Sequence, residues 1–133
     1  MKKLLPLLLL LALLSCSDKE KPDYNIQITA VKQAFEQKKI DPLQPYLAIG
    51  YTIKGLPEGL EALAIPQILQ QVPAPIKYEI KSEAKEEMGT RVKALFYYAD
   101  GKPKNVDFLI AGDGKILELN IMNDAKIDAT SGK

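Results

Sequence analysis

Hydrophobic and polar residues follow two different periods along this chain, and the period changes near residue 76. Between residues 24 and 35 the apolar side chains Tyr24, Ile28, Val31 and Phe35 recur at the spacing of one helical stripe. From residue 76 onward, apolar side chains occupy every second position, which is typical of strands with one buried face. The pattern predicts helices first and strands afterwards.

The first predicted helix has clear boundaries. Asp23 is a suitable N-cap, and the helix should stop before Asp41, because a residue that precedes a proline disfavours the helical conformation. A short helical turn is predicted over residues 42–47, followed by a brief extended piece over residues 51–54.

A second helix is predicted to begin with Pro57 as its first residue and to end before Pro73. Pro66 falls inside this helix, where it lacks a backbone donor, so the pattern predicts a kink or two short helices. The predicted buried side consists of five apolar residues: Leu60, Leu63, Ile68, Leu69 and Val72.

The second half of the sequence predicts four strands. Asp100-Gly101 and Gly112-Asp113-Gly114 lie between the later strands and are typical of tight hairpin turns. We therefore predict an α+β domain in which N-terminal helices pack on one face of a four-stranded antiparallel meander. The predicted inward-facing residues are, strand by strand, Ile76, Tyr78 and Ile80; Val92, Ala94, Phe96 and Tyr98; Val106, Phe108 and Ile110; and Leu117, Leu119 and Ile121.

The N-terminus has a different pattern from the rest of the chain. Lys2 and Lys3 precede an apolar run from Leu4 to Leu14, which ends at Ser15 and Cys16. A basic start, a short apolar stretch and a small residue at the end are the parts of a secretory signal peptide. The run has 11 residues, whereas a helix that spans a bilayer needs about 20.

The sequence Leu13-Leu14-Ser15-Cys16 resembles the lipobox of bacterial lipoproteins. This resemblance implies cleavage between Ser15 and Cys16 and lipidation of Cys16. Ser17 resembles the outer-membrane sorting signal of such proteins, which implies a lipid anchor in the outer membrane of a Gram-negative bacterium, on either its periplasmic or its surface face. The predicted organisation is a signal peptide (1–15), a flexible tether (16–22), one domain (23–123) and a polar tail (124–133).

Charge and cysteine content narrow the possible partners. The leader holds two of the 18 basic residues, which leaves 16 against 17 acidic residues. A nearly neutral chain argues against nucleic acid as a partner, because such binding depends on neutralising phosphates. Cys16 is the only cysteine, so no disulfide can form within the chain.

The order of the predicted elements resembles the NTF2-like cone of the cystatin-like superfamily. Residues 34–55 are similar to the helix, turn and returning strand that open such domains, and residues 105–122, with FLIAGDGKILELN, are similar to their closing hairpin. The resemblance implies a curved sheet and an apolar pocket between helix and sheet. A cystatin-type domain that lacks this pocket is the alternative fold.

Some NTF2-like proteins are enzymes that use an aspartate with a histidine or with a tyrosine. This chain has no histidine, and acylation of Cys16 would leave no free thiol, so we assign no catalytic, cofactor-binding or metal-ligating residue and expect no cofactor. The strand carboxylates are predicted on the face opposite the apolar one. Asp41, with Tyr78 or Tyr98, is the remaining acid–base candidate; alternatively, Asp41 simply begins a turn before Pro42.

The resemblance to NTF2-like domains implies two binding surfaces. The predicted pocket is lined by inward-facing aromatic residues: Tyr78, Phe96, Tyr98 and Phe108. The predicted interface, for a homodimer or a protein partner, consists of apolar residues on the outward sheet face: Leu95, Tyr97, Leu109 and Ile116.

The sequence favours a membrane-anchored lipoprotein of the cell envelope whose domain binds a small apolar ligand or a protein partner without catalysis. Two alternatives remain open. One is a small isomerase- or hydratase-type enzyme that uses Asp41 with a tyrosine, and the other is a purely structural envelope component.

Overall fold

The structure, a computed structural model, describes residues 23–122, 125 and 127. These residues form two α-helices, one short 3₁₀ helix and one five-stranded sheet, which confirms the α+β class. The predicted signal peptide, the cleavage site at Ser15 and Cys16, and the tether lie outside the described residues, as does most of the predicted tail. In the described part of the chain, no helix is both long and apolar enough to cross a membrane.

Helix α2 (Asn25–Gln37) forms where the first helical stripe predicts it, and all four residues of the stripe are buried. Its N-cap is Tyr24 rather than Asp23. Asp23 still stabilises the helix start, because its Oδ1 accepts a hydrogen bond from the backbone N–H of Asn25 at 3.0 Å. The helix ends at Lys38, which adopts the left-handed conformation with φ 56°.

After this helix, the 3₁₀ helix η1 (Gln44–Tyr46) leads directly into strand β1 (Leu47–Ile53). The strand is longer than the predicted extended piece. Ile49 at its centre is fully exposed and Gly50 has φ 79°, while Leu47 and Ile53 at its ends are buried. Because this burial does not alternate, the sequence pattern concealed the first part of the strand.

Helix α3 (Glu61–Gln71) corrects two details of the prediction. It begins four residues after Pro57, and it is continuous through Pro66 rather than split into two helices. Pro66 is exposed, and so is Ala62, whose carbonyl would have been the partner of the missing N–H. Water can therefore solvate that carbonyl, which makes the proline tolerable at this position.

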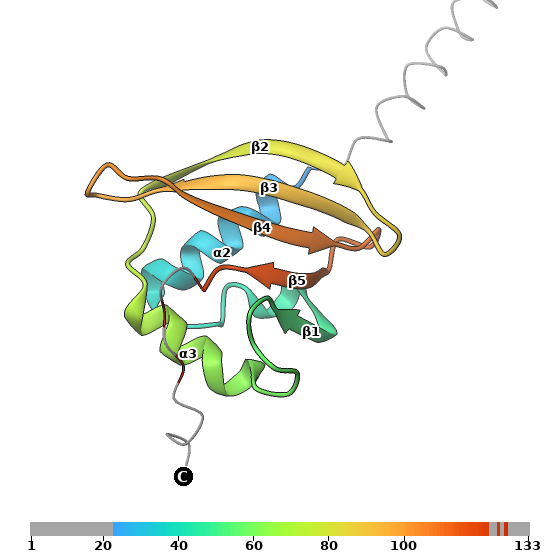
Figure 1. Ribbon diagram of the computed structural model, residues 1–133, viewed down its shortest axis with the longest axis horizontal. Coiled ribbons are helices and arrows are strands. Elements are labelled where there is room, and N and C mark those ends of the chain that lie inside the picture. The colour runs from blue at the N-terminus through green and yellow to red at the C-terminus, as the bar shows by residue number, and fades with distance from the viewer. Residues whose placement is uncertain (1–22, 123–124, 126, 128–133) are drawn as a thin grey trace, which may run out of the picture.

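The sheet has the order β1-β5-β4-β3-β2 (Figure 1). The strands β2 (Lys77–Lys85), β3 (Thr90–Tyr97), β4 (Lys104–Ile110) and β5 (Ile116–Asn120) form the predicted antiparallel meander. The prediction of a purely four-stranded antiparallel sheet is wrong, because β1 pairs in parallel with β5 and makes the sheet mixed. A parallel partner that lies about 70 residues away in sequence leaves no hairpin signal.

Strand β5 contains an irregularity that changes which of its side chains reach the core. Leu109 pairs with Glu118, but the next residue, Ile110, pairs with Ile116. Ile116 is therefore fully buried, and Leu117, which we predicted to face inward, is only half-buried. A bulge of this kind interrupts strict alternation, which the sequence pattern assumed.

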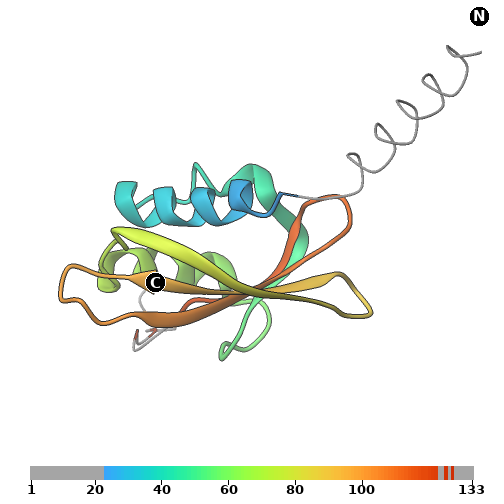
Figure 2. The same cartoon turned by 90° about the horizontal axis from the view of Figure 1, so that it is seen from above.

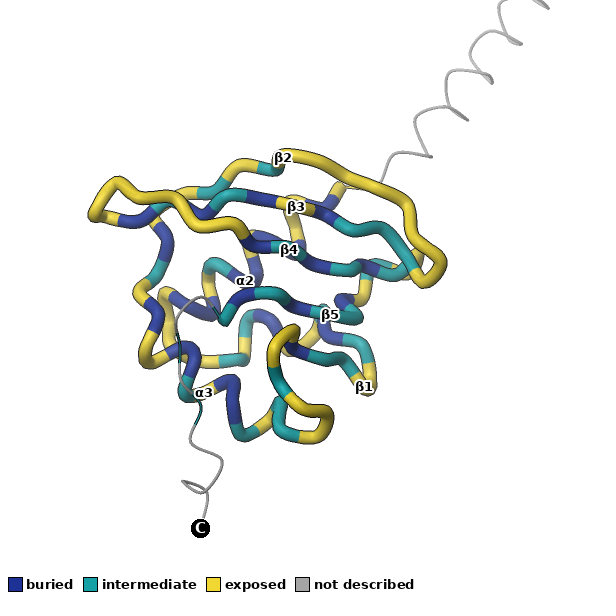
Figure 3. Tube along the Cα trace, viewed as in Figure 1, coloured by how far each residue is buried: buried dark blue, intermediate teal, exposed yellow. Residues whose placement is uncertain are grey.

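The helices cover one face of the sheet. Figure 2 shows α2 lying across that face, and Figure 1 shows α3 beyond β5, next to β1. The central strands alternate between buried and more exposed positions along the tube in Figure 3, whereas most of β2 is exposed at the sheet edge. Ile76, just before β2, is 61% exposed, contrary to the prediction that it faces inward.

Candidate functional site

The predicted aromatic pocket is largely a filled core. Phe96 and Phe108 have no exposed surface, and their ring centroids lie 6.4 Å apart. Phe35 from α2 meets Phe96 edge-on at 6.5 Å, and Tyr78 contacts Phe96 at the same centroid distance. These rings occupy the space between α2 and the sheet, so Phe96 and Phe108 stabilise the core, and only Tyr98 of the four predicted residues lines the open pocket described next.

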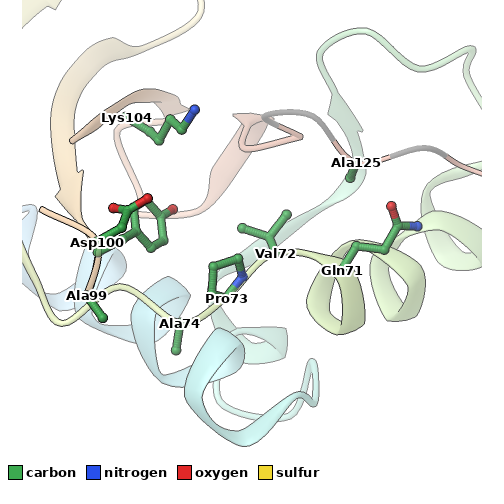
Figure 4. Close-up of a pocket in the computed structure, with 9 residues that line it drawn as sticks. Gln71, Val72, Pro73, Ala74, Ala99, Asp100, Lys104 and Ala125 are labelled. Carbon is green, nitrogen blue, oxygen red and sulfur yellow. The ribbon is translucent and has the colours of Figure 1, made fainter. Parts of the chain in front are cut away.

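This open pocket, which we term the apolar pocket, lies between the C-terminal end of α3 and the β3–β4 turn, and its volume is about 410 Å³. In Figure 4, Val72 and Pro73 lie between two sides of the pocket, with Asp100 and Lys104 on one side and Gln71 and Ala125 on the other. Apolar atoms thus form the centre of the wall, and charged groups stand at one edge. The lining residues are Gln71, Val72, Pro73, Ala74, Tyr98, Ala99, Asp100, Lys104 and Ala125.

Local sequence explains the shape of this pocket. Val72 terminates α3 in an extended conformation, and the following Pro73 cannot continue the helix. On the other side, Gly101 adopts φ 82° and donates its N–H to the Tyr98 carbonyl at 2.9 Å. Asp100 Oδ1 accepts a hydrogen bond from the backbone N–H of Lys102 at 2.9 Å. Two breaks in regular structure therefore face each other across the pocket.

Asp41, the acid–base candidate, lies exposed after α2. It lines a second depression of about 490 Å³ together with Tyr51, a tyrosine that the sequence analysis did not pair with it. Burial, and to a smaller extent the nearby Glu61 carboxylate, raise the pKa of Tyr51. Neither predicted tyrosine lines this depression: Tyr98 lines the apolar pocket, and Tyr78 donates its hydroxyl to Asn25 Oδ1 at 2.8 Å.

The outward face of the sheet carries a cluster of charged side chains centred on Arg91. Its Nη1 bonds to Asp107 Oδ1 at 3.0 Å and to Glu118 Oε1 at 2.5 Å, while Nε and Nη2 bond to the two oxygens of Glu86 at 3.1 Å each. Asn120 donates to the other oxygen of Asp107 at 2.7 Å. We term these five residues the Arg91 cluster.

The charges in the Arg91 cluster stabilise one another. The hydrogen bond from Arg91 lowers the pKa of Glu86, and the bonds to Glu86 and Glu118 raise the pKa of Arg91. Asp107 and Glu118 lie on the outward face, as predicted. The cluster is a set of satisfied ion pairs, which is a structural role rather than a catalytic one.

The predicted interface loses one of its four members. Ile116 is buried in the core because of the β5 irregularity, whereas Leu95, Tyr97 and Leu109 are half-buried. Tyr97 donates its hydroxyl to Glu79 at 3.0 Å, which raises the pKa of Tyr97, and the Lys77 ammonium lies 4.8 Å from its ring centroid. An interface through this face stays a prediction.

Sequence reasoning missed most of the apolar pocket. Most of its lining comes from the loops that follow α3 and β3, and small side chains such as Ala74 and Ala99 carry no chemical signal. Pro73 and Pro75 predict where the helix ends, but they do not predict which residues lie opposite them in the pocket. Among the described residues, no group of three acidic, histidine or cysteine side chains could hold a metal ion.

No family model matches this chain, and neither does any curated protein. The solved structures that are similar to it include the following three. The first is a protein from Kribbella flavida DSM 17836, described as of known function, with a TM-score of 0.43 and 14% identity over 78% of this chain and 85% of that one. The second is an NTF2-like protein of unknown function from Exiguobacterium sp. 255-15, with a TM-score of 0.42 and 20% identity over 72% and 92%. The third is a de novo designed protein with a curved β-sheet, with a TM-score of 0.40 and 14% identity over 80% and 88%.

Proposed function

We propose that this protein is a lipid-anchored binding protein of the bacterial cell envelope, whose NTF2-like domain holds a small apolar ligand in the apolar pocket. The observation that carries the proposal is the pocket itself. Its volume of about 410 Å³ falls within the range of small-molecule sites, which is about 300–1,000 Å³.

The wall of the pocket supports a ligand with an apolar body and one polar end. Val72, Pro73 and Tyr98 offer an apolar surface, while Asp100 and Lys104 stand together at one edge. An apolar body would gain about 25 cal/mol for each Å² of surface removed from water, and a polar end near the charged pair would keep its hydrogen bonds.

The geometry around Asp41 gives catalysis less support than binding. An acid–base pair needs two groups that meet at the reacting atom, and Asp41 is exposed at a turn. Tyr51 in the same depression has a raised pKa, which makes the phenol a weaker acid.

A substitution at the mouth of the pocket tests the ligand. In the mature chain, residues 16–133 with Cys16→Ser, Ala99→Trp places an indole in the pocket. We expect it to abolish the fluorescence enhancement of a naphthylamine probe that the parent protein binds. Ala84→Trp is the matched control, since Ala84 is exposed on β2 and does not line the pocket. Equal probe binding by both variants would argue that the pocket holds no ligand.

The anchor is tested separately, because it rests on the sequence pattern that ends at Cys16. Cys16→Ala should leave a longer chain without lipid that no longer partitions into the detergent phase. Ser17→Ala is the control, since it keeps the thiol that would be acylated. Unchanged partitioning of the Cys16 variant would remove the lipoprotein proposal and leave the ligand proposal standing.

A further inference from the structure

A third depression, separate from the apolar pocket and from the depression beside Asp41, lies where the start of α2 meets the far end of the β2–β3 hairpin and the β4–β5 turn. Its volume is about 660 Å³. We term it the acidic cleft, because ionisable and polar side chains line much of it: Asp23, Gln27, Glu83, Lys85, Thr90 and Asp113.

Gln27 sets the polarity of this cleft. Only 8% of this residue is exposed. The other buried residues of the described chain are apolar. Its Nε2 donates to the Gly114 carbonyl at 3.0 Å, while its Oε1 has no hydrogen-bond partner. A carbonyl can only accept, so the amide cannot be turned round without setting two acceptors against each other. Oε1 is therefore left without a donor among the described residues, whereas most buried polar atoms have one.

A bulge in β2 brings further charge to the cleft. The register shifts between Ile80 and Ser82, after which Glu83 pairs with the buried Val92 and Lys85 pairs with Thr90. Glu83 consequently lies on the side of the sheet that α2 covers, instead of alternating to the outer face. Bulges next to active sites often change the face of the sheet on which a side chain lies.

The charges of the cleft favour a cation. Three carboxylates, those of Asp23, Glu83 and Asp113, line it with a single ammonium, that of Lys85. Two of the carboxylates are held in place, since Asp23 accepts from the N–H of Asn25 and Asp113 from that of Lys115, each at 3.0 Å. Because the carboxylates do not converge into a metal site, their spacing suits an extended cation better than a single ion.

We propose that the acidic cleft binds an aliphatic polyamine, with one primary ammonium donating to Gln27 Oε1 and the remaining charge balanced by the carboxylates. A primary ammonium supplies both the N–H donor that Oε1 lacks and the positive charge that the cleft favours. A quaternary ammonium supplies only the charge. This difference makes the proposal specific.

The test is calorimetric titration of spermidine into the full-length chain in a non-ionic detergent at low salt, where charge interactions are least screened. We expect saturable binding of one spermidine per chain. Glu83→Gln should weaken it about five-fold, the effect of losing one exposed ion pair of about 1 kcal/mol. Glu87→Gln is the matched control: it removes one exposed carboxylate from the same hairpin but does not line the cleft, so its affinity should stay within about two-fold.

Two further titrations test whether binding requires an N–H donor on the ligand and the side chain of Gln27. Spermidine with all three nitrogens methylated to quaternary ammonium groups should bind at least about ten-fold more weakly, because it has no N–H to donate. Gln27→Met should weaken spermidine as well, and if that variant does not fold, the methylated ligand still tests the donor requirement. No binding at about 10 mM spermidine would overturn the proposal. So would equal binding of the methylated ligand, or equal effects of the Glu83 and Glu87 substitutions.

Discussion

The side chains on the two faces of the sheet are held together by different interactions. On the face covered by α2, Phe96 and Phe108 are fully buried, and Phe96 contacts both Phe108 and Phe35. On the outer face, Arg91 joins three carboxylates from two strands and a hairpin, with 18% of its side chain exposed. The comparison shows that burial stabilises one face and charge pairing the other, so the faces should respond to different perturbations.

The largest effect is expected on the inner face. Phe96→Ala should lower the free energy of unfolding by about 3–5 kcal/mol, because it removes a fully buried ring and leaves a cavity. Denaturant unfolding of the mature chain with Cys16→Ser measures this loss. Such a loss is a large share of the total stability of a small domain, about 5–15 kcal/mol. A loss below about 1 kcal/mol would contradict the packing described for this face.

An intermediate effect is expected at the centre of the Arg91 cluster. Arg91→Met keeps much of the apolar stem but leaves Asp107 and Glu118 without their cation. We expect a loss of about 1–3 kcal/mol at neutral pH, in the range for charged hydrogen bonds that are partly exposed. Thermal unfolding, followed by circular dichroism, measures this change. A Met variant as stable as the parent would mean that the Arg91 cluster contributes nothing to the free energy of unfolding.

The pH dependence separates the two faces further. Because the folded pKa of Glu86 is lowered below its ordinary value of 4.5, its pairing with Arg91 stabilises the fold fully above that value and is lost as the pH falls through the folded pKa. The stability difference between the parent and Arg91→Met should therefore shrink on going from pH 6 to about pH 3. The Phe96→Ala difference should stay constant over the same range, which makes that variant the control.

The smallest effect is expected for a charge on the outer face that lies outside the cluster. Lys93 is exposed and neighbours Asp107 across the strands, but no ion pair joins them. Lys93→Ala should change the free energy of unfolding by no more than about 0.5 kcal/mol, measured by the same denaturant titration. An effect as large as that of Phe96→Ala would mean that the inner and outer faces have been exchanged.

Alternation in the sequence was sufficient to predict the inner and outer faces of β3 and β4. Val92, Phe96 and Phe108 are buried, whereas Lys93 and Asp107 lie opposite, because neither strand contains a bulge in the part that pairs. In β5 the pattern failed at an irregularity of register, which buries Ile116 and leaves Leu117 half-buried, whereas Leu119 beyond it is buried as predicted. Strand β1 was only partly predicted, because its partner is distant in sequence.

The candidate sites were predicted less well than the fold. The sequence identified Tyr98 as a pocket residue, but the facing residues Val72 and Pro73 come from a loop whose position depends on how α3 packs. Gln27 was missed because a single glutamine within a helical stripe looks like any solvated polar residue. Its burial depends on the β4–β5 turn, which lies 87 residues away.

The place of β5 in the sheet also bears on how the molecule assembles in time. Within the described residues, β5 is the last strand and lies between β1 and β4, and β1 has no other described strand beside it. A ribosome that still holds residues 116–120 therefore leaves β1 without its hydrogen-bonded neighbour and the buried Ile53 without its paired residue, Leu119. The β2–β4 meander can form early from local contacts, whereas closure of the sheet must wait for the final strand, as expected for pairings between distant parts of a chain.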